Sequence, residues 1–271
     1  AIDAFGEDVT SPTPTPAAAY LYKTCEEADD LNDEQSEIFH LVNQNLLNIS
    51  KRARPDIETA VAYLTTRASK STTYDWNKLK RVFRFVNCTI DDVRIIGASG
   101  LMELYIWMDA SYAAHPDMRG QTEGAMSMGW GMMHCKSGKQ KLNTKRSTET
   151  EVVGTSDYVP HNIQAVMFME GQGYKLTKNV LYQDNQSAIK METNSRNSCT
   201  GNSRHIHIRY FFVKDRVDKN ELSIEYCPTE IMVADFSSQT SIVILAFSWS
   251  SNDSRVCFDG GVVDGYVDGD E

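Results

Sequence analysis

The stretch ELYIWMD, residues 103–109, decides the fold class because its side chains alternate between two faces. Leu104, Ile106 and Met108 share one face, and the residues between them share the other. A period of two is typical of a β-strand, whereas the preceding residues repeat their apolar positions every three or four residues. The sequence therefore predicts a change from helices to a sheet near residue 100.

Upstream of this strand, three stretches between residues 34 and 90 have helical spacing, and Arg54-Pro55-Asp56 separates the first two. We expect a small all-helical unit there. Downstream, the pattern predicts a hairpin in residues 124–144 with its turn at 136–139, a helix over 147–170, a strand over 179–184, helices over 186–192 and 206–218, a strand over 222–226 and a last helix over 230–237. This order describes one mixed α/β domain.

The composition is that of a globular chain of about two domains, since 41% of the 271 residues are hydrophobic and 24% are charged. The net charge of −10 comes from the two ends of the chain. Residues 1–40 hold ten acids and one base, and residues 252–271 hold six acids and one base. The remaining 41–251 hold 25 bases and 21 acids, and this mildly basic centre permits a phosphate-backbone partner.

Several classes of protein are disfavoured by what the sequence lacks. The six cysteines include no CxxC pair, which argues against a zinc knuckle or a dense disulfide scaffold. The longest apolar run, Ile242–Phe247, is far shorter than the ~18 residues of a membrane span. No basic start leads into an apolar stretch, as a signal peptide would require. We expect an intracellular, soluble chain with no membrane partner.

Four acidic residues stand where strands are expected to end or helices to begin, namely Asp109, Glu151, Asp184 and Asp235. Carboxylates from separate elements repel one another, so a site that gathers them usually needs cations, and oxygen-only ligands suit Mg²⁺ or Mn²⁺. Two such ions about 4 Å apart can activate a water and stabilise the leaving oxygen of a phosphodiester. Each acid also has a structural interpretation, as a solvated strand end, a capping-box residue, an N-cap or a surface acid, respectively.

A resemblance to a known family extends this argument. The stretch YQDNQSAI, residues 182–189, resembles the DNQSAI box in the ribonuclease H (RNase H) domain of Ty1/copia-type retrotransposon Pol polyproteins. Other family motifs are matched in the expected order by RPDI (54–57), LKRV (79–82), WMDASY (107–112), SGKQK (137–141), STETE (147–151), RHIHIRY (204–210) and YCPTE (226–230), followed by Ala234-Asp235. The similarity spans about residues 34–236.

The resemblance implies an RNase H-like mixed five-stranded sheet flanked by helices and preceded by a small helical segment. It divides the chain into an acidic Pro-rich linker (1–33), a helical remnant of the thumb side of reverse transcriptase (34–98), an RNase H-like domain (99–239) and an unrelated acidic tail (240–271). It implies hydrolysis of the RNA strand of RNA–DNA hybrids, leaving a 3′-hydroxyl and a 5′-phosphate, in a Pol protein of a cytoplasmic replication particle or the nucleus.

Carried over residue by residue, the catalytic acids of the family fall on Asp109, Glu151, Asp184 and Asp235, which would hold two Mg²⁺ ions, with Mn²⁺ as a substitute. Glu151 is preferred because the catalytic Glu of the family opens an apolar helix, and Glu149 is the fallback. The expected partners are the hybrid duplex and the rest of the Pol polyprotein.

Residues around these acids are expected to contact the duplex: Lys139, Lys141, Thr148, Asn185, Gln186 and Arg204. The two lysines belong to a basic run, together with Lys136, Lys145 and Arg146, that contains no acid. It would either hold phosphates of a hybrid or form a solvated hairpin. Hybrids are recognised through a wide minor groove and 2′-hydroxyls, so we expect low sequence selectivity.

The chain also departs from the family pattern. His207 stands where the family has Asp, and the sequence after Asp235 does not continue as the family does. The Tyr-x-Asp-Asp turn of a polymerase is missing, and the palm and fingers would lie upstream of Ala1. These departures motivate an alternative, in which the chain is an inactive retrotransposon remnant that binds nucleic acid or serves as a polymerase scaffold.

Overall fold

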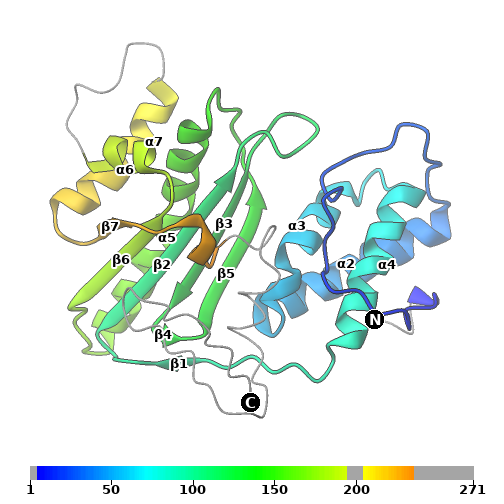
Figure 1. The fold of residues 1–271 in the computed structure, drawn as a ribbon, viewed down its shortest axis with the longest axis horizontal. Helices are drawn as coiled ribbons and strands as arrows, with labels where there is room; N and C mark the ends of the chain where they lie inside the picture. Colours follow the sequence, from blue (N-terminus) through cyan, green and yellow to red (C-terminus); the bar gives the residue numbers. More distant parts are fainter. Residues whose placement is uncertain (1–4, 194–203, 235–271) are drawn as a thin grey trace, which may run out of the picture.

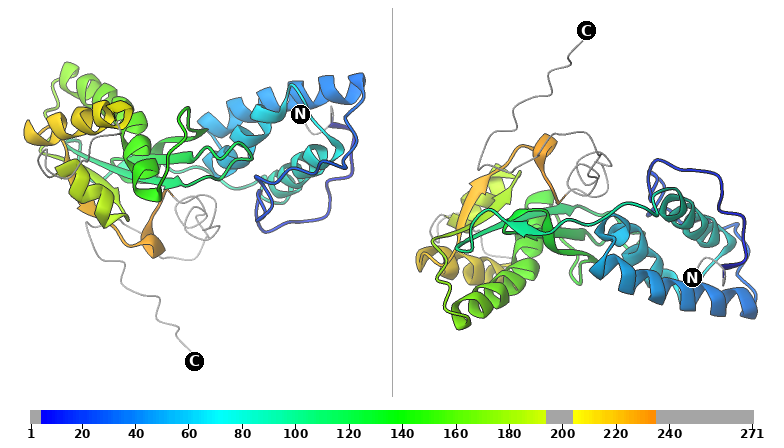
Figure 2. Two further views of the ribbon diagram at one scale, coloured as in Figure 1. Left: turned by 90° about the horizontal axis from the view of Figure 1, so that it is seen from above. Right: turned by 90° about the horizontal axis from the view of Figure 1, so that it is seen from below.

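The computed structural model describes residues 5–193 and 204–234, which form two lobes (Figure 1; Figure 2). One lobe is a sheet with helices, and the other is a group of helices with the N-terminal segment around them. The expected fourth acid, Asp235, and the expected tail, 240–271, lie outside the described residues.

The sheet has five strands in the order β5-β3-β2-β6-β7. These are β2 (Glu103–Ser111), β3 (Gln121–Ser127), β5 (Met132–Lys139), β6 (Lys178–Gln183) and β7 (Ser223–Tyr226). β2, β3 and β5 pair antiparallel, whereas β6 is parallel to β2 and β7 is parallel to β6. The expected mixed five-stranded sheet flanked by helices, with a helical segment before it, is confirmed.

The hairpin turn is not where the sequence predicted it. The chain reverses at residues 128–131, where Gly129 and Gly131 have positive φ angles of 117° and 67°. There β4 (Gly129–Trp130) pairs with β1 (Gly97–Ala98). The expected turn at 136–139 is wrong, because Lys136-Ser137-Gly138-Lys139 lies inside β5. Only the earlier glycines adopt the left-handed backbone that this turn requires.

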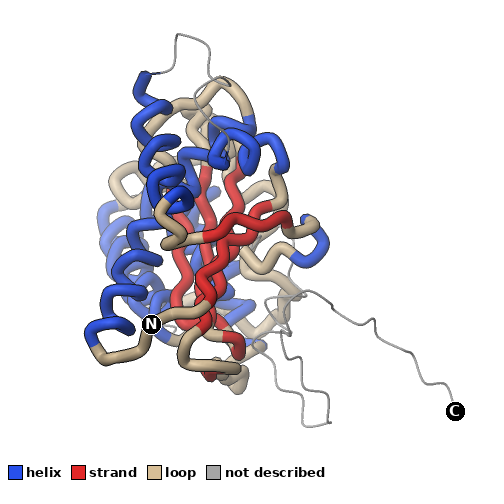
Figure 3. The backbone as a smooth tube through the Cα atoms, turned by 90° about the vertical axis from the view of Figure 1, so that its left-hand side faces the viewer, coloured by secondary structure: helices blue, strands red, loops and turns tan. Residues whose placement is uncertain are grey.

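Helices cover one face of the sheet (Figure 3). They are α5 (Ser147–Gly171), α6 (Gln186–Thr193) and α7 (Arg204–Asp218). Leu104, Ile106 and Met108 on β2 pack in one buried cluster with Tyr158 on α5 and Val213 on α7. The apolar face read from residues 103–109 is therefore the face that the helices bury.

The expected last helix, 230–237, is not formed in its described part. Residues 229–231 make a single 3₁₀ turn, η3 (Thr229–Ile231), and Met232, Val233 and Ala234 continue without helix. These three side chains are buried on the other face of the sheet, in a cluster with Tyr105 and Trp107. Apolar packing of all three consecutive residues favours a non-helical path, since a helix would turn them to different sides.

Tyr105 and Trp107, on the opposite face of β2 from Leu104, stack on the neighbouring strand. The rings of Trp107 and Tyr182 are 5.6 Å apart, and those of Tyr105 and Tyr182 are 6.5 Å apart. Tyr105 and Trp107 are buried. In this structure both side chains belong to the core.

The helical lobe consists of α2 (Asp33–Arg52), α3 (Glu58–Arg67) and α4 (Thr73–Cys88), with η1 (Pro55–Ile57) at the predicted break. Residues 5–31, predicted as part of a linker, pack on this lobe. The ring of Phe5 lies 4.6 Å from that of Trp76 and 4.7 Å from that of Phe83. Across the described residues, every helix is too short or too polar to be a candidate membrane span.

The two lobes meet through buried polar groups on α3, β3 and β5. Thr59 donates a 2.7 Å hydrogen bond to Glu123, and Ser137 donates to the same carboxylate at 3.2 Å. The backbone N–H of Ser137 donates to Glu58 at 3.3 Å, and Ser50 donates to Glu58 at 2.8 Å. Glu58 and Glu123 are fully buried, and the bonds from Thr59 and from the backbone N–H of Ser137 cross between the lobes and stabilise their contact.

We expect Gly124→Ala to destabilise the protein by about 1–3 kcal/mol, because a Cβ at this position would overlap the ring of Tyr158. Gly138→Ala in the adjacent strand is the control, since nothing lies within 4 Å of a Cβ there. Urea unfolding measures both variants. Equal midpoints for the two would contradict the close packing of α5 on β3.

Candidate functional site

Three of the four predicted acids come together at one edge of the sheet. Asp109 lies near the end of β2, Asp184 directly follows β6, and Glu151 lies in the second turn of α5. Each offers a carboxylate oxygen, and these oxygens all lie within 4.8 Å of one another. The arrangement follows from the parallel pairing of β2 with β6, which places the carboxyl ends of both strands side by side.

The first turns of α5 are held against β2 and β3 by close packing and buried hydrogen bonds. The side-chain amide of Gln140 donates to the carbonyl of Thr150 and to the hydroxyl of Thr122, both at 2.9 Å. A Cβ on Gly154 would lie 2.8 Å from the sulfur of Met108, so only glycine allows the helix to approach β2 this closely. These contacts determine where Glu151 lies.

The two candidate glutamates of α5 have different environments. Glu149 accepts a 2.8 Å hydrogen bond from the backbone N–H of Lys145, which precedes the helix, and so caps it. Glu151 is buried, and its Oε2 has no hydrogen-bond partner among the described residues. The capping role considered for Glu151 in the sequence is thus filled by Glu149.

Asp184 is likewise not the N-cap of α6. Asn185 takes that role, because its side-chain oxygen accepts from the backbone N–H groups of Ser187 and Ala188 at 3.0 and 3.1 Å. Asp184 instead accepts a 2.8 Å hydrogen bond from the hydroxyl of Thr229. Sequence reasoning did not single out Thr229, whose role depends on the path of the chain after β7.

The acid cluster, which we define as Asp109, Glu151 and Asp184, has a strongly unfavourable electrostatic environment. Burial raises the pKa of Glu151 well above its usual range, and the charges of Asp109 and Asp184 raise it further. The backbone N–H of Ala110 opposes this by hydrogen bonding to the carboxylate. A buried carboxylate oxygen without a partner, beside two other carboxylates, fits a divalent cation that prefers oxygen ligands.

A fourth acid near the cluster was missed by the sequence analysis. Glu192 on α6 is fully buried, and neither carboxylate oxygen has a hydrogen-bond partner within 3.5 Å among the described residues. Burial raises its pKa to about 8, and nearby Thr155 offsets this only in part. Its charge also helps to raise the pKa of Glu151. No local pattern in the sequence identifies Glu192, because its burial results from packing between helices.

The residues predicted to contact a duplex are spread around the cluster. Asn185 and Gln186 directly follow Asp184, and Thr148 lies one turn before Glu151. Lys141 is exposed, whereas Lys139 forms a 2.8 Å ion pair with Asp117. Arg204 is the first residue of α7, and only its backbone is described.

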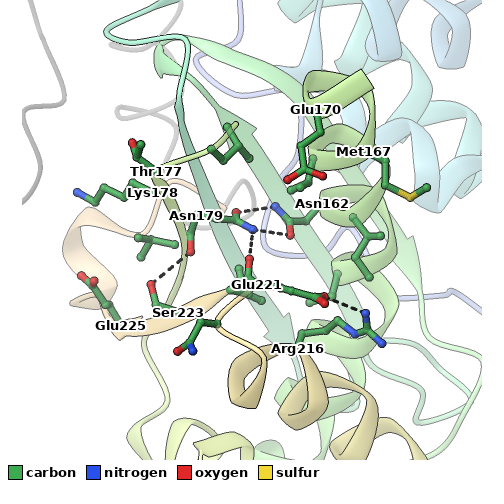
Figure 4. Close-up of a pocket in the computed structure, with 17 residues that line it drawn as sticks. Asn162, Met167, Glu170, Thr177, Lys178, Asn179, Arg216, Glu221, Ser223 and Glu225 are labelled. Atoms are coloured by element: carbon green, nitrogen blue, oxygen red, sulfur yellow. Dashed lines mark hydrogen bonds and ion pairs between the residues drawn. The ribbon is translucent and has the colours of Figure 1, made fainter. Parts of the chain in front are cut away.

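A cavity of ≈ 680 Å³ lies away from the acid cluster, at the amino ends of β6 and β7 (Figure 4). The amides of Asn162 and Asn179 hydrogen bond across it at 2.8 and 3.1 Å, and Arg216 pairs with Glu221 at 2.8 Å. Lys178, Asn179 and Val180 of β6 line it, and Asp184 lies four residues beyond Val180, about 13 Å along the strand. The cavity is therefore not part of the acid cluster.

We expect Mg²⁺ to raise the unfolding midpoint of the wild type by mass action, because the cation would neutralise the acid cluster in the native state only. At a concentration 100 times the dissociation constant, the gain would be about 2.7 kcal/mol. Glu151→Gln should lose this response, and Glu149→Gln should retain it. Thermal unfolding with and without Mg²⁺ measures both. The reverse pattern would contradict the assignment of Glu151.

Glu192 should make the protein less stable as pH rises. Its pKa is raised from 4.5 to about 8 in the folded state, so the folded protein binds more protons between these values. Stability therefore falls across this window, by a few kcal/mol in all, and Glu192→Gln should flatten the fall. Urea unfolding between pH 5 and pH 8 measures it, with Glu170→Gln, an exposed site on α5, as the control. An unchanged slope in Glu192→Gln would contradict the burial of this acid.

Comparison with known proteins finds sequence relatives among transposon polyproteins. No family model matches the sequence. A retrovirus-related Pol polyprotein from transposon TNT 1-94 of Nicotiana tabacum is 24% identical over 239 residues, covering 86% of this chain and 18% of the relative. A Pol polyprotein from transposon RE2 of Arabidopsis thaliana is 27% identical over 184 residues, covering 67% of this chain and 12% of the relative. The chain thus spans less than a fifth of the length of these relatives.

Among solved structures, LC11-RNase H1, isolated from compost by a metagenomic approach, is 10% identical with a TM-score of 0.36, covering 49% of this chain and 91% of that one. The chain is thus similar in sequence to retrovirus-related Pol polyproteins from plant transposons.

Proposed function

We propose that this chain is a metal-dependent RNase H that hydrolyses the RNA strand of RNA–DNA hybrids as part of a retrotransposon Pol protein. The observation that carries the proposal is the acid cluster, in which three carboxylates from β2, α5 and the end of β6 present oxygens within 4.8 Å of one another. The Pol relatives and the RNase H-like sheet support the same activity.

Asp109, Glu151 and Asp184 would hold the cation, with Asp235 as the proposed fourth ligand. When bound, Mg²⁺ supplies activation of a water and neutralisation of charge on the scissile phosphate. Attack of the water oxygen on phosphorus breaks the P–O3′ bond and leaves a 3′-hydroxyl and a 5′-phosphate.

The chain itself contributes the position of these ligands. Packing of Gly154 on β2 holds Glu151 in place, and the hydroxyl of Thr229 orients Asp184 by a 2.8 Å hydrogen bond. Such fixed carboxylates need no rearrangement when the cation binds.

We further propose roles for the residues around the cluster. Gln186 is exposed and Thr148 half-buried beside the acids, where they could contact the sugar edges of a hybrid. Lys141, which is exposed, would contact backbone phosphates, and Lys139 would do so by exchanging Asp117 for a phosphate. Asn185 acts on the substrate only indirectly, since its side chain caps α6. The helical lobe, residues 34–98, would be the remnant of the reverse transcriptase.

We expect the wild type to cleave a 5′-labelled RNA–DNA hybrid in Mg²⁺, and Asp184→Asn to lose at least about a hundredfold in rate while keeping the fold. Glu149→Gln is the matched control, because that carboxylate only caps α5. The rate is measured from labelled fragments on a gel.

Equal cleavage by Asp184→Asn would refute the acid cluster as the site. If the folded wild type cleaved no hybrid in Mg²⁺ or Mn²⁺ but bound hybrids in EDTA, the proposed activity would be refuted in favour of the scaffold alternative.

A further inference from the structure

A second cluster of titratable groups lies on the helix face of β5, outside the acid cluster. We define the basic cluster as His134 and Lys136 on β5 and His161 on α5. The ammonium of Lys136 donates a 3.0 Å hydrogen bond to Nε2 of His161. The rings of His134 and His161 are 5.0 Å apart.

The fold brings these residues together by simple periodicity. His134 and Lys136 are two residues apart on a strand, so both point to the same face. Tyr158 and His161 are three residues apart on α5, so both face β5. The hydroxyl of Tyr158 lies 3.0 Å from Nδ1 of His134 and orients this ring. Nε2 of His134 makes no hydrogen bond with any described residue.

The basic cluster has no acidic partner of its own. Among the described residues, none of its three members forms an ion pair. Asp157 pairs with Arg209, and Glu58 pairs with Lys51. Asp157 nonetheless attracts Lys136 electrostatically.

The surrounding charges are mostly positive, and they act against protonation of the basic cluster. Burial, together with the smaller effects of His161, Lys51, Lys136 and Arg94, lowers the pKa of His134 to about 4. Burial and the neighbouring cations also lower the pKa of Lys136 and of His161. An anion bound here would remove this repulsion.

We propose that His134, Lys136 and His161 form a binding site for a phosphate oxyanion, separate from the acid cluster. Lys136 supplies ammonium donors, and each imidazole can supply an N–H once it takes up a proton. The phosphate is either free or part of a nucleic-acid backbone, because both present the same charged oxygens. This inference does not depend on the proposed nuclease activity.

The two sites are too far apart to share one phosphate. His161 lies ten residues after Glu151 on the same helix, which corresponds to about 15 Å along its axis. They are also opposite in charge, since one gathers carboxylates and the other gathers bases. A phosphate at the basic cluster would therefore need no metal ion.

The test is an NMR titration of the histidine side chains with inorganic phosphate in EDTA, which removes metal-dependent binding at the acid cluster. We expect the imidazole signals of His134 and His161 to shift together and to saturate. Lys136→Gln should weaken this binding about tenfold or more, since it removes a charged hydrogen-bond donor. Lys175→Gln, at an exposed residue between α5 and β6, should bind as the wild type does.

A second arm distinguishes the two sources of phosphate. A fluorescent single-stranded oligonucleotide is titrated in EDTA and followed by anisotropy, with the same variants. Loss of affinity in Lys136→Gln but not in Lys175→Gln would assign the site to a nucleic-acid backbone. Unchanged oligonucleotide affinity, together with the phosphate response, would assign it to free phosphate.

Three results would overturn the proposal. The first is no shift of His134 and His161 with phosphate in a folded wild type. The second is loss of the response in Asp184→Asn, which would place the binding at the acid cluster. The third is a shift with Zn²⁺ in EDTA-free buffer but none with phosphate, which would make the histidines metal ligands. His161→Gln provides a second variant if Lys136→Gln does not fold.

Discussion

The parallel pairing of β2 with β6 is the constraint on which the rest of the structure depends. Parallel neighbours end at the same edge of a sheet, so Asp109 and Asp184 become adjacent although 75 positions separate them in the sequence. Parallel strands also require a long connection, and α5 lies within it. Its passage across the sheet brings Glu151 to the edge where both strands end.

Bringing three carboxylates together opposes folding because their charges repel. The packing of the elements that carry them holds them in place. Gly154 lets α5 approach β2, and Gln140 hydrogen bonds the helix to β3. Glu149 caps α5 and Asn185 caps α6. The polar residues near the site therefore divide into those that satisfy the backbone and those that remain available for a cation. Glu192 adds to the repulsion, since its carboxylate is buried without a close partner.

The same helix carries two sites of opposite charge. Its first turns present Glu151 to the acid cluster, and its middle presents His161 to the basic cluster on β5. The helical lobe contributes to the second environment, because Lys51 and Arg94 act on His134. The buried bonds from Thr59 and Glu58 to β3 and β5 keep these cations near the edge strand. The lobes are thus electrostatically coupled as well as packed.

The sequence by itself determined the strand at 103–109 and the helix over 147–170, because alternation and helical spacing are local properties of the chain. The order of its motifs also singled out the three residues of the acid cluster. It misplaced the hairpin turn, since Gly138 looks like a turn residue while the positive φ angles belong to Gly129 and Gly131. Only the tertiary structure decided that Glu149 caps, that Glu192 is buried, and that His134 meets His161. Those outcomes depend on which surfaces of distant segments come into contact, and burial sets the charge state of a side chain only after that contact is made.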